Sequence, residues 1–542
     1  MKKTIIKVLK ETVAIPSLTS SLKENELSAY LYNYLSQIKY FKDNNDYFGQ
    51  FELTNDHLKR KVIYGLVKGK TNRTIVLLNH YDVVGVTDFG NIQEYAFDID
   101  VISDKLKEMS ISEEARKDLC SDEWIFGRGT CDMKGGLAIQ IAYLQEYSEK
   151  INKAGNILFI SVPDEESYSE GMRGTVKLLR DLKQKHKLDY RLMINSEPNR
   201  KIEGEQVISY GTAGKCLPVV LVQGKKAHIA SCFDGLNPIG LLTEIFSDTE
   251  LSLDFSDEID GEVTVPPTWN YLKDMKNEYD VSIPMRACGY FSVISFYRSP
   301  DEILEKIIHI AGKAFKRYIR KMNQIYSEYR KIYKHASAEQ IDYQPIVITF
   351  EKLIELAKNK GKNDFTKFYE KIYHDISKLL ELNEINYPQA TITIMNEVLN
   401  YTELNYPVII VGFSPPYYPA LNSKNLLKES EFSGYCQAIK QHLKTNFGLD
   451  IIFENYSVAL SDCSYCGVDK IFNYQKFAKN TPIWGDLYSI DFNGMENLNI
   501  PFFILGPWGK DLHQMTERVN IKSLTEIIPS TLNLLVNNIF NE

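Results

Sequence analysis

The segment GRGTCDMKGG, residues 127–136, is the feature from which the organisation of this 542-residue chain can be derived. It contains one carboxylate, Asp132, and leads into an apolar run at 137–144. Because glycine tolerates positive φ and lets backbones approach closely, such a loop can place Asp132 deep in a crowded site. A carboxylate has two oxygens and can bridge two cations. Asp132 is therefore the candidate centre of a metal site.

Residues that could complete this site follow four short apolar runs. The runs are 74–78, 156–162, 190–194 and 501–506, and they are followed by His80, by Glu165 and Glu166, by Glu197 and by His513. In parallel sheets, ligands gather beyond the carboxyl ends of the strands. Independent chance would rarely put four such groups at four expected strand ends, so the sequence predicts a metal site at one edge of a sheet.

Each of these residues also has an ordinary explanation when taken alone. A histidine at a strand end is usually a buried polar residue, and a glutamate pair usually begins a solvated helix. An aspartate in a glycine-rich loop is usually a turn residue. The order of the groups and their common place at strand ends favour the metal site over these separate explanations.

The apolar runs alternate with helical patterns at 133–149 and 171–186, which is typical of parallel strands buried on both faces. A single core stops growing near roughly 250–300 residues, so a chain of this length predicts at least two domains. The pattern changes after Glu197, and we expect a catalytic α/β domain at 1–205 and 414–542, interrupted by an inserted domain at 206–413. The runs 61–67 and 74–78 are expected to form a hairpin around the turn 65–71.

The composition excludes several classes of function. A net charge of −8 argues against a general phosphate-binding surface, and no apolar run approaches the roughly 20 residues of a membrane-spanning helix. Residues 1–14 suit an amphipathic helix better than a signal peptide. Lysines and arginines in the helical run 301–334 are interleaved with glutamates, which favours a solvated face over a nucleic-acid site. We therefore expect a cytoplasmic protein that binds neither nucleic acid nor membrane.

Eight cysteines are scattered through the chain without the dense spacing of a secreted disulfide scaffold. Cys463 and Cys466 form a CxxC, but no second CxxC would complete a four-thiolate zinc site. Ordinary thiols are the favoured interpretation of this pair.

The motifs around these residues resemble the M20 family of metal-dependent peptidases and amidohydrolases, which includes aminoacylases, bacterial glutamate carboxypeptidases and succinyl-diaminopimelate desuccinylase. The resemblance spans almost the full chain and depends on five motifs in the family's order. Five further segments resemble the RocB subgroup of arginine-utilisation proteins: PMRA at 284–287, SPPYYP at 414–419, SDCSY at 461–465, PIWGD at 482–486 and GPWGKDLH at 506–513.

The resemblance implies a fold and a set of roles. It implies a zinc-peptidase-like catalytic domain with a mostly parallel sheet flanked by helices, interrupted by an inserted α+β lid and dimerisation domain. His80 would bind one metal ion, Asp132 would bridge two, Glu166 and Glu197 would each complete one ion, and His513 would bind the second. The cofactors would be two divalent ions, Zn²⁺ first, with Co²⁺ or Mn²⁺ as alternatives.

The remaining roles implied by the resemblance concern catalysis and substrate. Asp82 would fix the His80 tautomer, and Glu165 would be the general base. His228, in the inserted domain, would stabilise an oxyanion, in its own chain or in the partner of a homodimer. Arg286 is a candidate for holding a substrate carboxylate.

The resemblance implies an amide hydrolase that acts on a small N-acyl amino acid or short peptide, and it suggests a place in the catabolism of arginine or other amino acids. A non-catalytic binding or regulatory descendant of the same fold is the alternative. The presence of Glu165 together with every ligand position argues against that alternative. The extra helices at 301–382 could enlarge a dimer contact or replace the partner.

Overall fold

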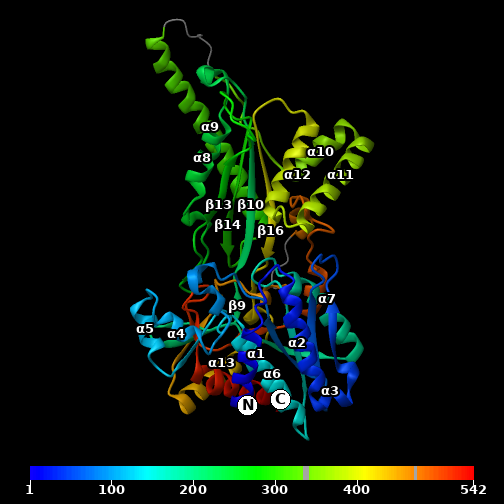
Figure 1. The fold of residues 1–542 in the computed structure, drawn as a ribbon. Helices are drawn as coiled ribbons and strands as arrows, with labels where there is room; N and C mark the ends of the chain where they lie inside the picture. The colour runs from blue at the N-terminus through cyan, green and yellow to red at the C-terminus, as the bar shows by residue number, and fades with distance from the viewer. Residues whose placement is uncertain (334–340, 469–472, 542) are drawn as a thin grey trace. The chain divides into compact units, whose positions relative to one another are not determined.

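The computed structural model describes residues 1–333, 341–468 and 473–541, and it divides into two compact units (Figure 1). The first unit comprises Met1–Ala213, Pro419–Asp469 and Ile490–Glu542, and the second comprises Gly214–Tyr418 and Lys470–Ser489. The sequence pattern predicted an insertion at 206–413 only, with the segment 470–489 in the catalytic domain. The role of the inserted domain as a lid and a dimer contact stays a prediction.

The first unit is built on a nine-stranded sheet with the order β1-β2-β5-β3-β6-β19-β8-β18, in which β7 also pairs with β8. The strands are β1 (Phe48–Glu52), β2 (Lys61–Val67), β3 (Arg73–His80), β5 (Asn156–Val162), β6 (Asp189–Asn195), β7 (Lys201–Ile202), β8 (Glu205–Ser209), β18 (Ile451–Glu454) and β19 (Phe502–Ile504). Its centre is parallel, because β3 pairs in parallel with β5 and β6, and β19 with β6. Every residue of β5 is buried, as expected for a central strand between two layers of helices.

The hairpin expected around residues 65–71 is wrong. Strand β2 pairs with β5 in antiparallel fashion, and β5 separates β2 from β3. The turn between β2 and β3 packs against the segment before β5 instead, where Lys70 N donates to Lys153 O at 2.8 Å. A Cβ at Gly69 would lie 2.1 Å from Gly155 O, so this close approach depends on glycine. Local turn chemistry alone did not reveal that a later strand lies between the two.

Helices flank the sheet. They include α1 (Lys2–Val13), α2 (Lys23–Gln37), α6 (Lys134–Glu149), α7 (Glu170–His186), α13 (Glu429–Phe447), α15 (Phe492–Leu498) and α16 (Ile528–Asn541). Helix α6 is buried almost all round and packs against β3 and β5, with α1 and α16 covering it. Its residues Leu137, Ile141 and Leu144 belong to the main core cluster. The apolar run that follows the glycine-rich loop is therefore a central helix, and its first turn is held close to the strand ends.

The second unit contains a five-stranded sheet with the order β13-β14-β10-β16-β15, antiparallel except for the β15–β16 pair. The strands are β10 (Gly214–Gln223), β13 (Thr268–Asp274), β14 (Arg286–Ser295), β15 (Val347–Thr349) and β16 (Val408–Tyr418). Helices α8 (Pro238–Thr249) and α9 (Pro300–Ile332) pack together. Ser299 and Glu302 form a capping box that begins α9.

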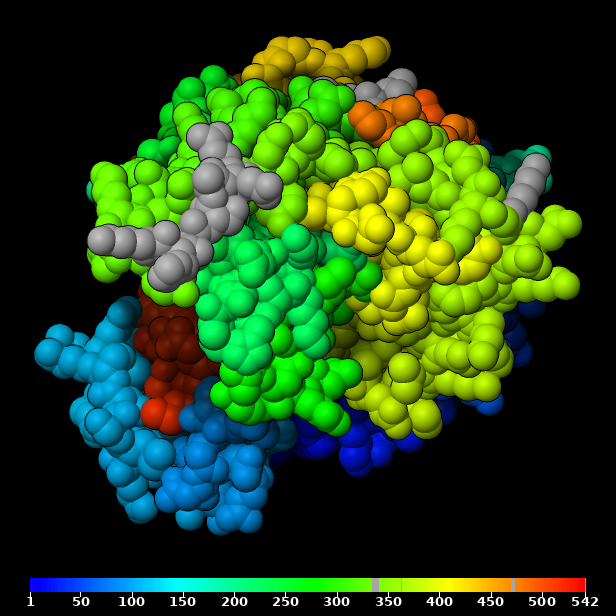
Figure 2. Space-filling model, turned by 90° about the horizontal axis from the view of Figure 1, so that it is seen from above, coloured from blue at the N-terminus to red at the C-terminus, as the bar shows by residue number. Residues whose placement is uncertain are grey.

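The extra helices expected at 301–382 correspond to α9, α10 (Phe350–Lys360) and α11 (Lys362–Glu381). A further helix, α12 (Tyr387–Thr402), packs against both α10 and α11. Figure 2 shows these three helices as one continuous surface in yellow-green and yellow. Within the described residues, none of the helices combines the length and the apolar character that crossing a membrane requires.

Candidate metal centre

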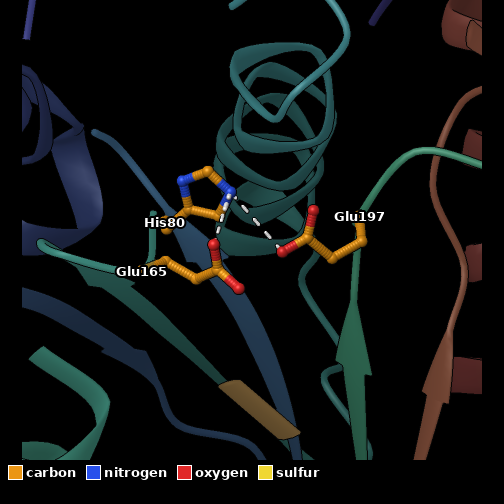
Figure 3. Close-up of side chains that lie close together, drawn as sticks. All are labelled: His80, Glu165 and Glu197. Atoms are coloured by element: carbon orange, nitrogen blue, oxygen red, sulfur yellow. Dashed lines mark ion pairs between the residues drawn. The ribbon is translucent and has the colours of Figure 1, made fainter. Parts of the chain in front are cut away.

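Three candidate residues converge from three neighbouring strands (Figure 3). His80 is the last residue of β3, Glu165 follows β5 and Glu197 follows β6. His80 Nε2 lies 3.9 Å from Glu165 Oε2 and 3.5 Å from Glu197 Oε1. The parallel pairing of β3 with β5 and β6 brings their carboxyl ends together, so the sheet itself assembles this part of the site.

Asp132 lies between two histidines. Its Oδ1 is 3.1 Å from His80 Nε2, and its Oδ2 is 3.2 Å from His513 Nε2. His513 Nε2 is also 3.1 Å from Glu166 Oε1. Two sets of N and O donors, one with His80 and Glu197 and one with His513 and Glu166, therefore share a single carboxylate.

The described part of the chain contains two groups of three residues that could hold a metal ion. Within each group, the ligand atoms lie within 4.8 Å of one another. One group is His80, Glu165 and Glu197, and the other is His80, Asp132 and Glu166. The first group contains Glu165, which the sequence analysis expected to act as the base. Glu165 is thus near enough to the ligands to contact a water molecule held among them.

Asp82 organises both the histidine and the glutamate pair. Its Oδ1 accepts the backbone N–H of Glu165 and its Oδ2 accepts that of Glu166, each at 3.1 Å. His80 Nδ1 donates to the backbone carbonyl of Asp82 at 3.0 Å and lies 3.5 Å from Oδ1. With Nδ1 engaged, the Nε2 of His80 is directed at Asp132 and Glu197, which is the orientation a metal-binding imidazole needs.

Glu517 holds the loop of Asp132, although no sequence motif indicates this role. Its buried carboxylate accepts the backbone N–H groups of Cys131 and Asp132 through Oε1, both at 3.1 Å. Its Oε2 accepts from Arg128 Nη1 at 2.8 Å. Arg128 is also buried and donates to Asp88. A lone glutamate four residues after His513 belongs to no local motif, so the sequence offered no signal for it.

Gln140 and Gly136 hold α6 against the strand ends. Gln140 Nε2 donates to Leu78 O and to Ser196 Oγ, both at 2.8 Å, and its Oε1 accepts from Asn79 Nδ2 at 2.9 Å. A Cβ at Gly136 would lie 2.1 Å from Ser196 O. The first turns of α6 thus fix the position of the segment that carries Glu197.

The two histidines are surrounded by carboxylates. Burial lowers the pKa of His80, but Glu197, Asp132 and Asp82 outweigh burial and raise this pKa well above its usual value. Hydrogen bonds to Asp132 and Glu166 raise the pKa of His513 to about 10. The carboxylates that favour the protonated, positively charged imidazoles would also favour a bound metal cation at the same place.

Burial and mutual repulsion oppose the simultaneous ionisation of the carboxyl groups in this site. Burial raises the pKa of Glu165 well above its usual value and raises that of Glu166 to about 7. Burial also raises the pKa of Glu197, against the lowering effect of His80. Burial acts on Asp132 in the same direction, but the imidazoles of His513 and His80 outweigh it and lower its pKa. Bound cations would relieve this concentration of negative charge.

Within the second unit, two further candidates have local partners. His228 is exposed and caps a short 3₁₀ turn, with Nδ1 accepting from Ala230 N at 3.1 Å. Arg286 donates from Nε and Nη2 to Gln223 Oε1, and from Nη1 to Asn396 Oδ1 and Asn400 Oδ1. Most of the guanidinium donors are thus used by neutral amides. The roles expected for His228 and Arg286 stay predictions.

The CxxC pair lies in the core. Cys463 and Cys466 are both buried free thiols, and Cys466 Sγ lies 3.1 Å from Met193 Sδ. Burial raises the pKa of Cys466 well above its usual value. A buried neutral thiol is a poor nucleophile and a poor metal ligand, in agreement with the interpretation as ordinary thiols.

The chain matches one protein family over most of its length. The model of Peptidase family M20/M25/M40 matches residues 95–536. The chain is 30% identical over 544 residues to Uncharacterized protein YqjN of Bacillus subtilis, which covers 99% of this chain and 96% of that protein. It is 27% identical over 531 residues to Protein RocB of the same bacterium, with coverages of 95% and 91%.

Solved structures of two peptidases have a similar fold. A tripeptidase from Staphylococcus aureus has a TM-score of 0.54 at 16% identity and covers 100% of this chain and 99% of its own. A dinuclear metal-binding M20 peptidase from Bacillus subtilis has a TM-score of 0.50 at 11% identity, with coverages of 99% and 98%. At these identities the likeness concerns the fold, and it confirms the expected α/β class.

Proposed function

The chain belongs to peptidase family M20/M25/M40 and is a hydrolase of that family; from this premise we propose that it cleaves an amide or peptide bond of a small N-acyl amino acid or short peptide, using water activated by two divalent metal ions. The observation that carries the proposal is the position of Asp132. Its two oxygens lie 3.1 and 3.2 Å from the Nε2 atoms of His80 and His513. A carboxylate between two imidazoles in this way is suited to bridge two cations.

We assign the ligands by this division. His80 and Glu197 would hold one ion, His513 and Glu166 the other, and Asp132 both. The donor set fits, because it offers imidazole nitrogen and carboxylate oxygen, and because Glu197 Oε1 is buried without a hydrogen-bond partner. Zn²⁺ suits these donors best, and Co²⁺ and Mn²⁺ accept similar ones. When bound, such ions supply a polarised substrate carbonyl and a water molecule with a pKa lowered to near ~7.

Glu165 is the proposed general base. It takes a proton from the attacking water as the oxygen–carbon bond forms, and it gives this proton to the amine nitrogen as the carbon–nitrogen bond breaks. Burial raises the pKa of Glu165, which favours the uptake of a proton from the water. Asp82 holds the backbone amides of Glu165 and its neighbour, so it positions the base relative to the ligands.

The second unit is proposed to complete the site in catalysis. His228 would stabilise the oxyanion of the tetrahedral intermediate, and Arg286 would hold a substrate carboxylate. The unit would act as a lid and as the contact of a homodimer. We place the reaction in the cytoplasm, in the breakdown of arginine or other amino acids. The free thiols and the resemblance to RocB support this placement.

Two measurements on the purified protein test the proposal. Metal analysis is expected to find two divalent ions per chain. A panel of N-acyl amino acids, N-acylarginine among them, and of dipeptides is expected to include compounds that the metal-loaded protein hydrolyses. Binding of metal without turnover of any compound would favour a non-catalytic descendant, and the lack of metal binding would remove the proposed mechanism.

A further inference from the structure

A short loop over the metal-site end of the first unit carries one more acidic side chain. The loop begins at Ser461 and continues into the 3₁₀ turn η6 (Asp462–Tyr465). Ser461 Oγ accepts from Asn195 Nδ2 at 2.9 Å and from Cys463 N at 3.2 Å. Asn195 is the last residue of β6, two positions before Glu197. The turn also contacts α7, the helix that follows Glu165 and Glu166. The loop is therefore fixed at the strand ends that carry the candidate ligands.

Asp462 is buried in this loop without a proper partner. Asp462 is only 2% exposed, and neither of its carboxylate oxygens has a hydrogen-bond partner of normal geometry. Burial raises the pKa of Asp462 to about 8, although His80 and Ser169 act to lower it. Among the described residues, no lysine or arginine forms an ion pair with Asp462. A buried carboxylate with unmet hydrogen-bonding capacity is costly. The buried carboxylate of Glu517, in contrast, accepts hydrogen bonds through both of its oxygens.

The carboxyl group of Asp462 interacts electrostatically with residues of the candidate metal centre. His80 lowers the pKa of Asp462 and Glu197 raises it. Asp462 in turn raises the pKa of Glu165. Asp462 therefore adds to the carboxyl groups near this centre, which include Asp82, Asp132, Glu165, Glu166 and Glu197. Two bound divalent ions would favour the ionised forms of these carboxyl groups and would offset only part of their combined negative charge. The centre would remain attractive to another cation after the metals are bound.

We propose that Asp462 is a specificity-determining residue that binds a cationic group of the substrate, an ammonium or a guanidinium, close to the scissile bond. A carboxylate that is preformed, buried and poorly partnered forms strong charge-assisted hydrogen bonds with such a group. The inference rests on the proposed function and narrows its substrate class to amides and peptides that carry a positive charge. A neutral or anionic acyl amino acid would leave Asp462 without its partner.

Two pairs of compounds test the proposal, because each pair differs in charge and hardly in shape. Glycyl-leucine and propionyl-leucine exchange an ammonium for a methyl group on the acyl side. Propionyl-arginine and propionyl-citrulline exchange a guanidinium for a neutral urea on the amine side. The enzymes to compare are the wild type, Asp462→Asn and the control Asp450→Asn. Asp450 is exposed and pairs with Lys444 at the surface.

The wild type and the control are expected to prefer the cationic member of one pair. Asp462→Asn is expected to lose about 10- to 100-fold in kcat/KM for that member and to change little for its neutral counterpart. The pair that responds identifies the group as ammonium or guanidinium. An equal loss on all four compounds, or a loss of bound metal in Asp462→Asn, would overturn the proposal in favour of a positioning role or a ligand role.

A failure of the proposed function has a different signature. In that case the metal-loaded wild type hydrolyses none of the four compounds. Calorimetric binding of the same pairs then tests Asp462 on its own. Tighter binding of a cationic member that disappears in Asp462→Asn supports the proposal, and equal binding of both members by the wild type overturns it.

Discussion

The carboxylate of Glu517 accepts the backbone amide of Asp132 at 3.1 Å, so the proposed bridging ligand is held through its main chain as well as through its neighbours. The other oxygen of Glu517 accepts from the buried Arg128. The side chain of Glu517 thus links the loop of the metal site to the buried guanidinium of Arg128. We therefore expect substitutions of Glu517 to affect both metal binding and stability.

We expect Glu517→Gln to weaken metal binding by about 10- to 100-fold. A glutamine has one acceptor oxygen, so it must leave either Arg128 or the amides of Cys131 and Asp132 unsatisfied. Arg128 keeps Asp88 as a partner, so the loss of one of its two carboxylate partners should lower stability by roughly 1–3 kcal/mol. Metal titration and thermal unfolding measure the two effects. Glu526→Gln, at an exposed residue that pairs with Lys2, is the control. Unchanged metal affinity in Glu517→Gln would show that the loop needs no such support.

Two helical glycines are expected to respond in opposite ways to alanine. A Cβ at Gly136 would lie 2.1 Å from Ser196 O, whereas a Cβ at Gly434 in α13 would have no atom within 4 Å. Gly136→Ala should therefore destabilise the first unit by about 1–3 kcal/mol. Gly434→Ala should stabilise it by about 0.5–1 kcal/mol, because alanine favours a helix. Urea unfolding followed by circular dichroism compares them, and a shift of the same sign in both variants would contradict this account.

Part of the site could be predicted from the sequence because the chemistry follows the strands. His80, Glu165 and Glu197 come directly after apolar runs, and parallel pairing brings the ends of such runs together. The structure joins these side chains with Asp132 and His513 at one edge of the sheet. Their roles as ligands or base stay predictions, since proximity alone does not distinguish them.

Other features had no local signal. Glu517 and Asp462 are single acidic residues, and their importance depends on burial and on partners far away in the chain. The prediction of a hairpin around 65–71 was wrong because the pairing of a strand depends on the whole sheet, in which β5 lies between β2 and β3. The segment 470–489 joins the second unit through packing of α14 (Tyr474–Lys479) against α9, a contact between distant parts of the sequence.

Asp132→Ala is expected to remove both metal ions. The substitution takes away the carboxylate whose oxygens lie beside His80 and His513, so neither ion keeps three protein ligands. Elemental analysis of the dialysed variant, compared with the wild type, measures the loss. Retention of one ion would limit Asp132 to a single site, and full retention would exclude a bridging role.

The glutamate pair is expected to separate two functions. Glu165→Gln should keep the metal ions and lose nearly all turnover, because glutamine preserves shape but cannot carry a proton. Glu166→Gln should lose metal affinity, since Glu166 Oε1 lies 3.1 Å from His513 Nε2 in the proposed second site. Metal content and kcat of both variants decide the assignment. The reverse pattern would exchange the roles of the two residues. Glu165 Oε2 lies 3.9 Å from His80 Nε2, so the test addresses both assignments.

His228 is expected to act in the site of a partner subunit. Its side chain is exposed, with Ala230 N as its hydrogen-bond donor, so its imidazole is accessible for contact with another chain. His228→Ala and Glu165→Gln should each be inactive alone. If one site takes Glu165 from one chain and His228 from the other, an equal mixture that exchanges subunits should recover about a quarter of the wild-type activity, because half of the dimers carry one intact site. Sedimentation of the mixture provides the control for dimer formation. An inactive mixture of exchanged dimers would mean that His228 acts in its own chain, and a monomeric protein without recovery would remove the shared site altogether.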